Sequence, residues 1–287
     1  MISVIVLTWN RVQLLQETLS SILNQTYQDL EILVIDNESI DGTEEYVKSL
    51  ADNHIRYFRN ANGGNLSVNR NFGIAHANGE YISFCDDDDL WEPNKLESQL
   101  QALNKFPEYK MVSTNGIYFS EKGIFGCLIK KREDGEITLN DLLSGKNDVF
   151  LSSVLIDREI FSNIGLFNEN PEIFTIEDYE LWVRIAKNYR IYFINDCLIK
   201  YRVHESMSSH KDTRKTVLKE KKMFLNLYGN DILGEEQYNK ICKNLEKKYR
   251  KASFKELFKR YRFIKSAVYL KRKIWYRLLS KANKAKV

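Results

Sequence analysis

The chain has 287 residues, of which 43% are hydrophobic and 29% charged, and it contains 13 glycines and 3 prolines. This composition is typical of one large globular domain, or of a domain with an appendage, and it excludes collagen-like, proline-rich and disordered architectures. The net charge of +4 conceals an asymmetry: residues 1–210 hold 19 Lys and Arg against 32 Asp and Glu, whereas residues 211–287 hold 24 against 7. The sequence therefore predicts an acidic body with a carboxylate-rich site, and a basic tail that either meets an anionic partner or forms a solvated helical face.

The first hundred residues alternate between strand and helix patterns with short connections. We predict strands at 2–8, 30–35, 55–58 and 80–85, and helices after Asn10, after residues 41–43, at 68–77 and after Pro93. Asn and Pro are residue types that begin helices. This alternation predicts an α/β fold with a mostly parallel, doubly wound sheet. Ligands of such sheets bind beyond the carboxyl ends of the strands.

The pattern becomes mixed after residue 110. Strands are predicted at 111–119 and 149–156, with a long polar loop at 120–147 between them. A helix is predicted at 176–187, followed by short strands near 191–194 and 198–203. From residue 210 onward only helical patterns with dense Lys and Arg follow. We therefore predict two domains, at 1–209 and 210–287.

Four successive aspartates, Asp86 to Asp89, follow the fourth predicted strand. Like charges in a row repel one another unless a cation or a hydrogen-bonding network compensates them. Mg²⁺ and Mn²⁺ prefer oxygen ligands, commonly one or two carboxylates together with substrate phosphates. The cluster therefore predicts a divalent metal site, while Asp89 alone is also suited to cap the helix that follows.

The exits of the first two strands are not glycine-rich. Residues 8–11 (TWNR) stand where a dinucleotide-binding fold would carry GxGxxG, and no GxxxxGK[ST] occurs, so NAD-binding and P-loop sites are excluded. Trp9 either offers a flat face for stacking on a base or is a core tryptophan. The loop at 36–43 (DNESIDGT) either hydrogen-bonds a nucleobase or serves as turn and helix cap.

Three further positions carry groups suited to chemistry, each with a structural alternative. Arg70 can hold a phosphate or pair with the aspartates. Asp178 can act as a general base, although Thr175 and Asp178 have the spacing of a capping box. His204, at the end of the last predicted strand, is either a ligand in the site or a structural histidine.

Taken together, these segments resemble the family 2 glycosyltransferases with the GT-A fold. The matching motifs, in the order expected for that family, are VIVLTWNR, QTYQDLEILVIDNESIDGT, NRNFGIAHANGEYISFCDDDDLWEP, IEDYELWVRI and YRVH. The resemblance covers residues 2 to about 209 and implies a Rossmann-like, mixed but mostly parallel sheet. Residues 210–287 lie outside it.

The resemblance implies a donor site and a metal site. Mn²⁺ or Mg²⁺ would be held by the residues that match the family's DxD motif and histidine: Asp86, Asp88 and His204. The nucleotide sugar would be bound by residues at the exits of strands one, two and four and by one arginine: Leu7, Thr8, Trp9, Asn10, Asp36, Asn37, Arg70, Asp86 and Asp87. Asn37 stands where the family often has an aspartate, which leaves the nucleotide open, with UDP preferred.

The same resemblance implies an inverting reaction. Asp178 matches the family's catalytic base, and Glu177 and Trp182 stand near it on the acceptor side or as support. Asp178 would take the proton of an acceptor hydroxyl, while the metal and Arg70 neutralise the departing diphosphate. We therefore expect a catalytic domain at 1–209 that transfers a sugar from a nucleotide-sugar donor to a lipid-linked or glycan acceptor in surface polysaccharide synthesis.

Two other functions fit parts of the sequence. A sugar-nucleotide nucleotidyltransferase has a related fold but carries a glycine-rich, basic loop after its first strand, which residues 8–11 do not form. A nucleic-acid-binding protein would use the basic tail and bind with a steep salt dependence. That function leaves the acidic motifs unexplained, and no specific nucleic acid is expected as a partner.

The tail and the cysteines bear on location. Segments 247–251 and 269–277 interleave aromatic residues with Lys and Arg, as in a helix lying on an anionic membrane surface; the alternative is an oligomerisation arm of a homo-oligomer. No apolar run could span a membrane, and the start of the chain lacks signal-peptide features. Four scattered cysteines indicate a reducing compartment rather than a disulfide scaffold or structural zinc. We expect a cytoplasmic protein, peripheral at the inner face of the cell membrane.

Overall fold

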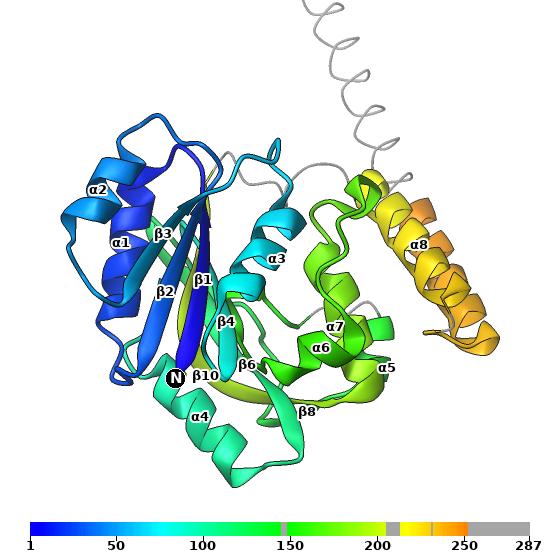
Figure 1. Cartoon of the computed structure of the whole chain (residues 1–287). Helices are drawn as coiled ribbons and strands as arrows, with labels where there is room; N and C mark the ends of the chain where they lie inside the picture. Colours follow the sequence, from blue (N-terminus) through cyan, green and yellow to red (C-terminus); the bar gives the residue numbers. More distant parts are fainter. Residues whose placement is uncertain (145–147, 205–212, 231, 252–287) are drawn as a thin grey trace, which may run out of the picture. The chain divides into compact units, whose positions relative to one another are not determined.

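The computed structural model describes residues 1–144, 148–204, 213–230 and 232–251 (Figure 1). The chain divides into two units, Met1–His210 and Lys211–Val287.

The first unit is built on one mixed sheet. Its strands lie in the order β3-β2-β1-β4-β9-β6-β10-β5, with β7 paired to β6 and β8 paired to β10. The strand bounds are β1 Ile2–Thr8, β2 Leu30–Asp36, β3 Ile55–Arg59, β4 Tyr81–Asp86, β5 Leu90–Trp91, β6 Tyr109–Ser120, β7 Gly123–Cys127, β8 Gly135–Ile137, β9 Val154–Asp157 and β10 Arg190–Arg202. Strands β3, β2, β1 and β4 are parallel, as are β6 and β10, whereas β9 is antiparallel to β4 and β6. Every residue of β1 and β2 is buried, as in strands covered on both faces.

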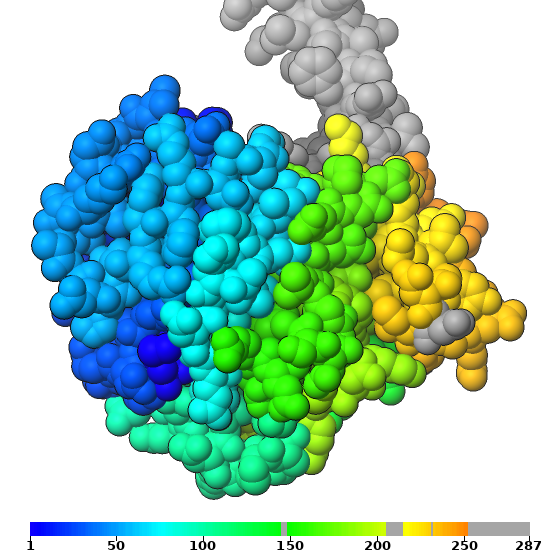
Figure 2. All heavy atoms as spheres, in the orientation of Figure 1, coloured from blue at the N-terminus to red at the C-terminus, as the bar shows by residue number. Residues whose placement is uncertain are grey.

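Helices cover both faces of this sheet (Figure 1). Their bounds are α1 Val12–Leu23, α2 Thr43–Ser49, α3 Leu66–His76, α4 Lys95–Lys105, α5 Leu139–Leu143, α6 Glu159–Ile164 and α7 Glu177–Asn188. On one face, Val4 and Val6 of β1 share a buried core with Leu15 of α1. On the other face α3 approaches β1 so closely that a Cβ on Gly73 would come within 2.7 Å of Ile5, so glycine is needed there. In the space-filling view, the blue-to-cyan first half and the green residues of the second half meet on this face (Figure 2).

The second half of this unit departs from the sequence predictions. The segment 120–147, predicted as a polar loop, contains β7, β8 and α5. The two short strands predicted after residue 190 are one strand, β10, with irregular register around Cys197. The strand predicted at 149–156 begins only at Val154, after the 3₁₀ turn Leu151–Ser153.

Three residues that were predicted to begin or cap helices do not do so in the structure. Asn10 does not cap α1; its side-chain oxygen accepts a backbone N–H of the loop after β2. Pro93 lies outside α4, because that helix begins only at Lys95. Asp89 does not cap α4 either, because its carboxylate accepts the backbone N–H of Arg202 at 3.0 Å. For Asn10 and Asp89, a hydrogen-bond partner distant in the chain thus replaces the predicted partner in the nearby helix.

Lys95 in the first turn of α4 is fully buried, which is rare for a lysine. Its Nζ donates to Gln99 Oε1 at 2.9 Å and to Ser83 Oγ at 3.3 Å, and it lies 3.8 Å from the centre of the Trp91 ring. Burial lowers the pKa of Lys95 to about 7, because the charged form loses its hydration.

Lys95 is expected to make the stability of the protein depend on pH. The unfolded chain keeps a lysine pKa near 10.5, so above pH 7 it binds more protons than the folded chain, and the free energy of unfolding rises with pH. Relative to a Lys95→Met variant, the wild-type chain should gain about 1 kcal/mol per pH unit between about pH 7 and 8.5. Urea unfolding of both proteins across this range measures the gain, and parallel pH profiles would contradict it.

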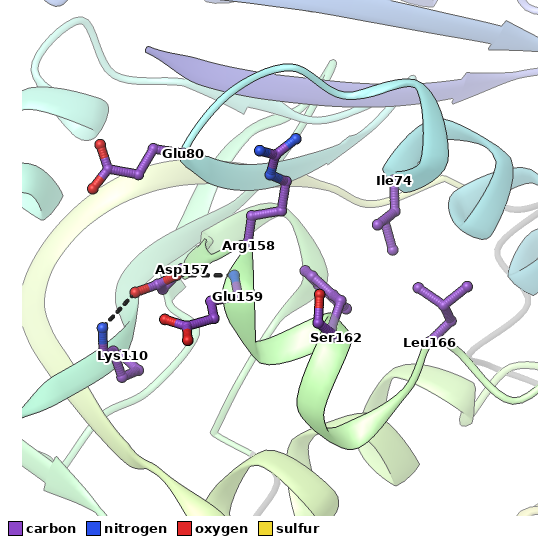
Figure 3. A pocket seen from close by; sticks show the side chains of 9 residues that line it. Ile74, Glu80, Lys110, Asp157, Arg158, Glu159, Ser162 and Leu166 are labelled. Atoms are coloured by element: carbon purple, nitrogen blue, oxygen red, sulfur yellow. Dashed lines mark hydrogen bonds and ion pairs between the residues drawn. The ribbon is translucent and has the colours of Figure 1, made fainter.

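A pocket of about 780 Å³ opens at the amino ends of β4 and β6 (Figure 3). It is lined by charged, polar and apolar side chains: Ile74, Glu80, Lys110, Asp157, Arg158, Glu159, Phe161, Ser162 and Leu166. Lys110 and Asp157 pair within it at 2.6 Å. Glu80 directly precedes β4, whereas Asp86 ends that strand, so the pocket lies at the edge of the sheet opposite to the aspartate cluster.

The second unit contains α8 (Thr213–Gly229) and a helical stretch at 235–251. The rings of Tyr228 and Tyr238 stack with centroids 4.7 Å apart, and Lys248 pairs with Glu220 at 2.6 Å, so contacts join the two helical stretches. In the part of the chain that the structure describes, no helix is both long and apolar enough to cross a bilayer. The aromatic and basic segment 269–277 lies outside the described residues, and its membrane role stays a prediction.

Candidate functional site

Three strands bring predicted site residues to one edge of the sheet. β1 lies between β2 and β4, and the register places Thr8 beside Asp36 and the buried Leu7 beside Asp86. The exits of these strands therefore meet at the carboxyl edge, where parallel sheets bind ligands. Trp9 directly follows β1 and is 59% exposed. The alternative of a core tryptophan is therefore wrong.

Asp87 and Asp88 share one arginine. Buried Asp87 accepts hydrogen bonds from the Thr8 hydroxyl at 2.9 Å and from Arg11 at 3.1 Å. Asp88 accepts from Arg11 at 3.0 Å and lies 2.8 Å from Nε2 of His204. The end of β10 thus joins the aspartate cluster at His204, while both oxygens of Asp87 are already engaged by the protein.

Asp86 and Asp89 are connected through a serine. The Ser152 hydroxyl donates to Asp89 at 2.6 Å and accepts the backbone N–H of Asp86 at 3.1 Å. Asp89 is buried, whereas 39% of the Asp86 side chain is exposed. Arg70 lies 3.8 Å from the Asp86 carboxylate. Asp89 is therefore a structural anchor, and Asp86 presents its carboxylate at the edge.

The aspartate cluster holds more negative charge than its arginines compensate. Burial, with repulsion from Asp88 and Asp87, raises the pKa of Asp86 to about 7 against the attraction of Arg70. Burial likewise raises the pKa of Asp87 to about 6. Within the described residues no three His, Cys, Asp or Glu side chains gather as a complete metal site. The predicted three-ligand set with His204 is therefore not formed by the protein alone, and a cation here needs further oxygen ligands.

Asp36 holds the loop after β2 rather than facing solvent. Its Oδ1 accepts the backbone N–H and the hydroxyl of Ser39 at 2.9 and 2.6 Å, and its Oδ2 accepts the Tyr57 hydroxyl at 2.6 Å. Ser39 Oγ also accepts the backbone N–H of Asn10 at 2.8 Å, which ties together the loops after β1 and β2. Asn37 Oδ1 is buried without a hydrogen-bond partner among the described residues. In this loop Asn37, and not Asp36, therefore has an acceptor that the protein leaves unused.

Strained backbone conformations lie next to predicted site residues. Asn10, itself a predicted site residue, and Glu38 and Thr175 have φ angles of 52°, 64° and 77°, and a fourth non-glycine residue with positive φ, Ala51 at 48°, lies away from the site after α2. This left-handed region disfavours any residue with a Cβ, and β-branched threonine most strongly. Such strain persists where the surrounding contacts impose it, and it clusters at functional sites. Here it accompanies the exits of β1 and β2 and the start of α7.

Arg70 on α3 connects the aspartates to α7. Its guanidinium is buried, donates to Glu177 and lies 3.8 Å from Asp86. Although burial opposes the charged form, Glu177, Asp86 and Asp178 raise the pKa of Arg70 above its usual range. The predicted pairing of Arg70 with the aspartates is limited to Asp86 at 3.8 Å, whereas its close partner is Glu177, which was not predicted. Arg70 Nε and Glu177 Oε2 are buried without partners among the described residues.

Removing Arg70 is expected to destabilise the fold. Arg70→Met leaves the Glu177 carboxylate, whose side chain is 4% exposed, buried without its partner, which costs about 3–5 kcal/mol. Replacing both Arg70 and Glu177 by Met should recover most of this loss, because neither charge is then buried alone. Urea unfolding compares the variants, and a double variant less stable than Arg70→Met would contradict the expectation.

Asp178 is the second residue of α7 and is not part of a capping box. The N-cap of α7 is Ile176, without a side-chain hydrogen bond, and Asp178 Oδ1 accepts the N–H of Tyr179 at 2.7 Å. The capping-box alternative is therefore wrong. Burial and the neighbouring Glu177 raise the pKa of Asp178 to about 6 against the attraction of Arg70. A carboxylate that titrates near neutral pH is suited to general-base catalysis.

Trp182 lies one turn after Asp178 on α7 but is fully buried. Its ring packs edge-on against Phe167, with centroids 6.4 Å apart, and Phe167 contacts Phe84 of β4 at 5.3 Å. Trp182 therefore attaches α7 to the sheet. Of its two predicted roles, support fits this position, and direct contact with an acceptor does not.

Sequence reasoning missed Arg11, Ser152 and Tyr201. Arg11 had a signal, because it is a cation directly after a strand that adjoins the aspartate strand. Ser152 had none, because its two partners are more than 60 residues away. Burial and the charges of Asp86 and Asp178 raise the pKa of Tyr201 above its usual range, which places this phenol in the field of the site.

Comparison with known proteins identifies the family. The family model of glycosyl transferase family 2 matches residues 3–165, more than half of the chain. The UDP-Glc:α-D-GlcNAc-diphosphoundecaprenol β-1,3-glucosyltransferase WfgD of Escherichia coli is 31% identical over 223 residues, which cover 74% of this chain and 81% of that protein. An uncharacterized glycosyltransferase of Rickettsia typhi is 32% identical over 216 residues, 73% of this chain. The matched region spans 66% of that protein and 35% of a Rickettsia felis relative.

Solved structures share the fold. Staphylococcus aureus TarS, in complex with UDP-GlcNAc, has a TM-score of 0.69 at 19% identity, covering 86% of this chain and 72% of that one. The mannosyltransferase PcManGT from Pyrobaculum calidifontis, in complex with GDP-Man and Mn²⁺, has a TM-score of 0.64 at 20% identity, covering 88% of this chain and 72% of that one. These likenesses confirm the predicted GT-A architecture. The family match over residues 3–165 and the 31% identity to WfgD place the chain among the family 2 glycosyltransferases.

Proposed function

We propose that the chain is an inverting, metal-dependent glycosyltransferase that acts on a hydroxyl of a lipid-linked or glycan acceptor in surface polysaccharide synthesis. The observation that carries this proposal is the connection through Arg70 between Asp86 and α7, the helix that bears Asp178. Arg70 thereby joins two parts of one site: the carboxylates suited to a metal-bound diphosphate, and the helix that carries the general base. The diphosphoundecaprenol acceptor in the name of WfgD supports the lipid-linked class.

The donor is a nucleotide sugar, with UDP the preferred nucleotide. Exposed Trp9 offers a face for the base, and Asn37 Oδ1 offers an unused acceptor for its edge. Leu7 and Thr8 end β1, and Asn10 follows that strand. Asp87 holds the end of β1 through Thr8, and Asp36 holds the loop after β2 through Ser39. WfgD and TarS are named with UDP-sugars, which supports UDP, whereas PcManGT is named with GDP-Man.

The residues present fit a divalent cation. Asp86 and Asp88 supply carboxylate oxygens, and His204 adds an imidazole beside Asp88. Burial, followed by repulsion from Asp88 and Asp87, raises the pKa of Asp86 to about 7. Two carboxylates together with substrate phosphates are a common ligand set for Mg²⁺ and Mn²⁺. Bound there, the ion supplies positive charge to the departing diphosphate. Mn²⁺ in the PcManGT complex supports this choice.

Asp178 performs the proton transfer. The acceptor oxygen forms a bond to the anomeric carbon as the bond from that carbon to the diphosphate oxygen breaks, and the nucleoside diphosphate leaves with the bonding electrons. The acceptor proton passes to the Asp178 carboxylate. Because attack comes from the face opposite the leaving group, the anomeric configuration inverts. Arg70 holds Glu177 beside the base, and Arg11 lends positive charge to the aspartates.

We further propose that the second unit brings the enzyme to the cytoplasmic face of the cell membrane. Residues 211–287 hold 24 Lys and Arg against 7 Asp and Glu, a balance suited to anionic headgroups. The acidic first unit, with 19 basic against 32 acidic residues up to position 210, would not be drawn there by itself. Removal of residues 252–287 should then weaken sedimentation with anionic vesicles.

The test of the proposed function is a transfer reaction. The protein is incubated with a UDP-sugar of known anomeric configuration, Mn²⁺, and GlcNAc-diphosphate on a short lipid chain, and the product is analysed by NMR. The proposal predicts a new glycosidic bond of inverted configuration. A product that retains the donor configuration would contradict it.

A further inference from the structure

Three aromatic rings form a cluster at the carboxyl edge of β6 and β10. The ring of Tyr201 meets that of Tyr118 edge-on, with centroids 6.0 Å apart and an interplanar angle of 88°, and that of Phe150 at 5.7 Å and 60°. Tyr118 and Tyr201 are register partners on neighbouring parallel strands. All three side chains are half-buried. They are therefore ordered by one another yet still reach solvent.

This cluster adjoins the catalytic carboxylates. Arg202, next to Tyr201, donates its backbone N–H to Asp89, and Phe150 lies two residues before Ser152, which binds Asp86 and Asp89. The carboxylates of Asp86 and Asp178 both act on Tyr201 electrostatically. The rings therefore lie at the same edge of the sheet as the aspartate cluster, which Arg70 connects to Glu177 at the start of α7.

The chemistry of the cluster differs from that of the donor side. The donor diphosphate requires cations, whereas these three side chains are neutral. The Tyr118 and Tyr201 hydroxyls make no hydrogen bond to another described residue and are not among the buried unpaired side-chain atoms, so they are open to solvent or to a ligand. A sugar ring matches such a surface, because its C–H face packs on aromatic rings and its hydroxyls pair with the phenols.

We propose that Tyr118, Phe150 and Tyr201 form the wall of the acceptor subsite and hold a sugar ring of the acceptor next to Asp178. This inference rests on the proposed transfer reaction and assigns its acceptor side to residues of β6, β10 and the segment before the 3₁₀ turn. The rings supply binding, and the Tyr201 hydroxyl orients the acceptor. Donor binding does not involve the wall.

Substitution of Tyr201 tests the wall. With p-nitrophenyl glycosides and GlcNAc-diphosphate on a short lipid chain as acceptors, Tyr201→Leu should raise the acceptor KM about tenfold. The donor Kd and the slow hydrolysis of donor without acceptor should stay within twofold. Tyr201→Phe should keep the acceptor KM and lower kcat. Tyr192→Leu is the matched control, because Tyr192 lies on the same strand in a similar cluster with Phe106 and Tyr109 and should change neither constant.

The outcomes separate the subsite from the proposed function. An unchanged acceptor KM in Tyr201→Leu, with transfer by the wild type intact, overturns the wall alone. A rise in donor Kd equal to the rise in acceptor KM also overturns it, because the rings would then serve the donor. Absence of transfer by the wild type with every nucleotide sugar instead overturns the function on which the wall rests. If Tyr201→Leu fails to fold, Tyr118→Leu takes its place with the same expected shift.

Discussion

Asp178→Asn is expected to lower the transfer rate by about 10²- to 10⁴-fold while leaving donor binding within a few-fold. Asn has nearly the same shape and can still accept the N–H of Tyr179, so the start of α7 should remain in place. What the amide cannot do is take the proton of the acceptor hydroxyl. The loss should therefore fall on kcat for transfer, measured with saturating donor, and not on the donor Kd.

A second buried carboxylate on α7 provides the control for Asp178. Glu180 is bound by Arg184 in a salt bridge at 2.8 Å and belongs to the packing of the helix rather than to the carboxylate that pairs with Arg70 at its start. Glu180→Gln should lower the free energy of unfolding and leave kcat of the folded protein unchanged. Asp178→Asn should lower kcat and leave the free energy of unfolding unchanged. A variant Asp178→Asn that keeps the full transfer rate would remove the base from the proposed mechanism.

Asp88→Ala is also expected to have a large effect. The variant should lose metal-dependent donor binding, and its transfer rate should fall by at least about 10²-fold. The change removes a carboxylate that contacts both Arg11 and His204. Without it the site keeps one predicted carboxylate ligand, Asp86, for the ion. Calorimetric titration with a UDP-sugar in Mn²⁺ and in EDTA measures the effect directly.

The metal-free titration serves as an internal control for Asp88→Ala. In EDTA the wild type and the variant should bind the donor with similar, weak affinity, because the lost interaction runs through the ion. In Mn²⁺ only the wild type should gain affinity. An Asp88→Ala variant that still binds more tightly in Mn²⁺ than in EDTA would place the ion elsewhere.

Strong periodic patterns made the first half of the fold predictable. β1 and β2 are rich in apolar residues, and helices with regular apolar spacing lie between the strands, so alternation alone indicated a parallel sheet. Because parallel strands end at one edge of a sheet, the sequence alone indicated that Trp9, Asp36 and Asp86 lie close together. The segment 120–147 was different: β7, β8 and α5 have only three to five residues each, too few for a period to emerge.

Polar residues at loop positions were harder to predict, because their types suit local and distant partners equally well. Asn10 and Asp89 are good helix caps by type, yet they bind backbone N–H groups 30 and 113 residues away. Thr175 and Asp178 have the spacing of a capping box, but the left-handed backbone of Thr175 accompanies a helix that starts later. Tyr201 lies in the YRVH motif, but that motif gave it no role, and only the pairing of β10 with β6 brings it to Tyr118.

A donor-binding titration tests directly whether the chain binds a nucleotide sugar together with a divalent metal. Purified protein is titrated with UDP-, dTDP- and GDP-sugars, each in Mn²⁺, in Mg²⁺ and in EDTA. At least one nucleotide sugar, with a UDP-sugar the first expectation, should bind tightly with metal and weakly in EDTA. Absence of binding across the panel, with salt-sensitive binding of oligonucleotides instead, would contradict it and make the basic second unit the main functional part of the chain.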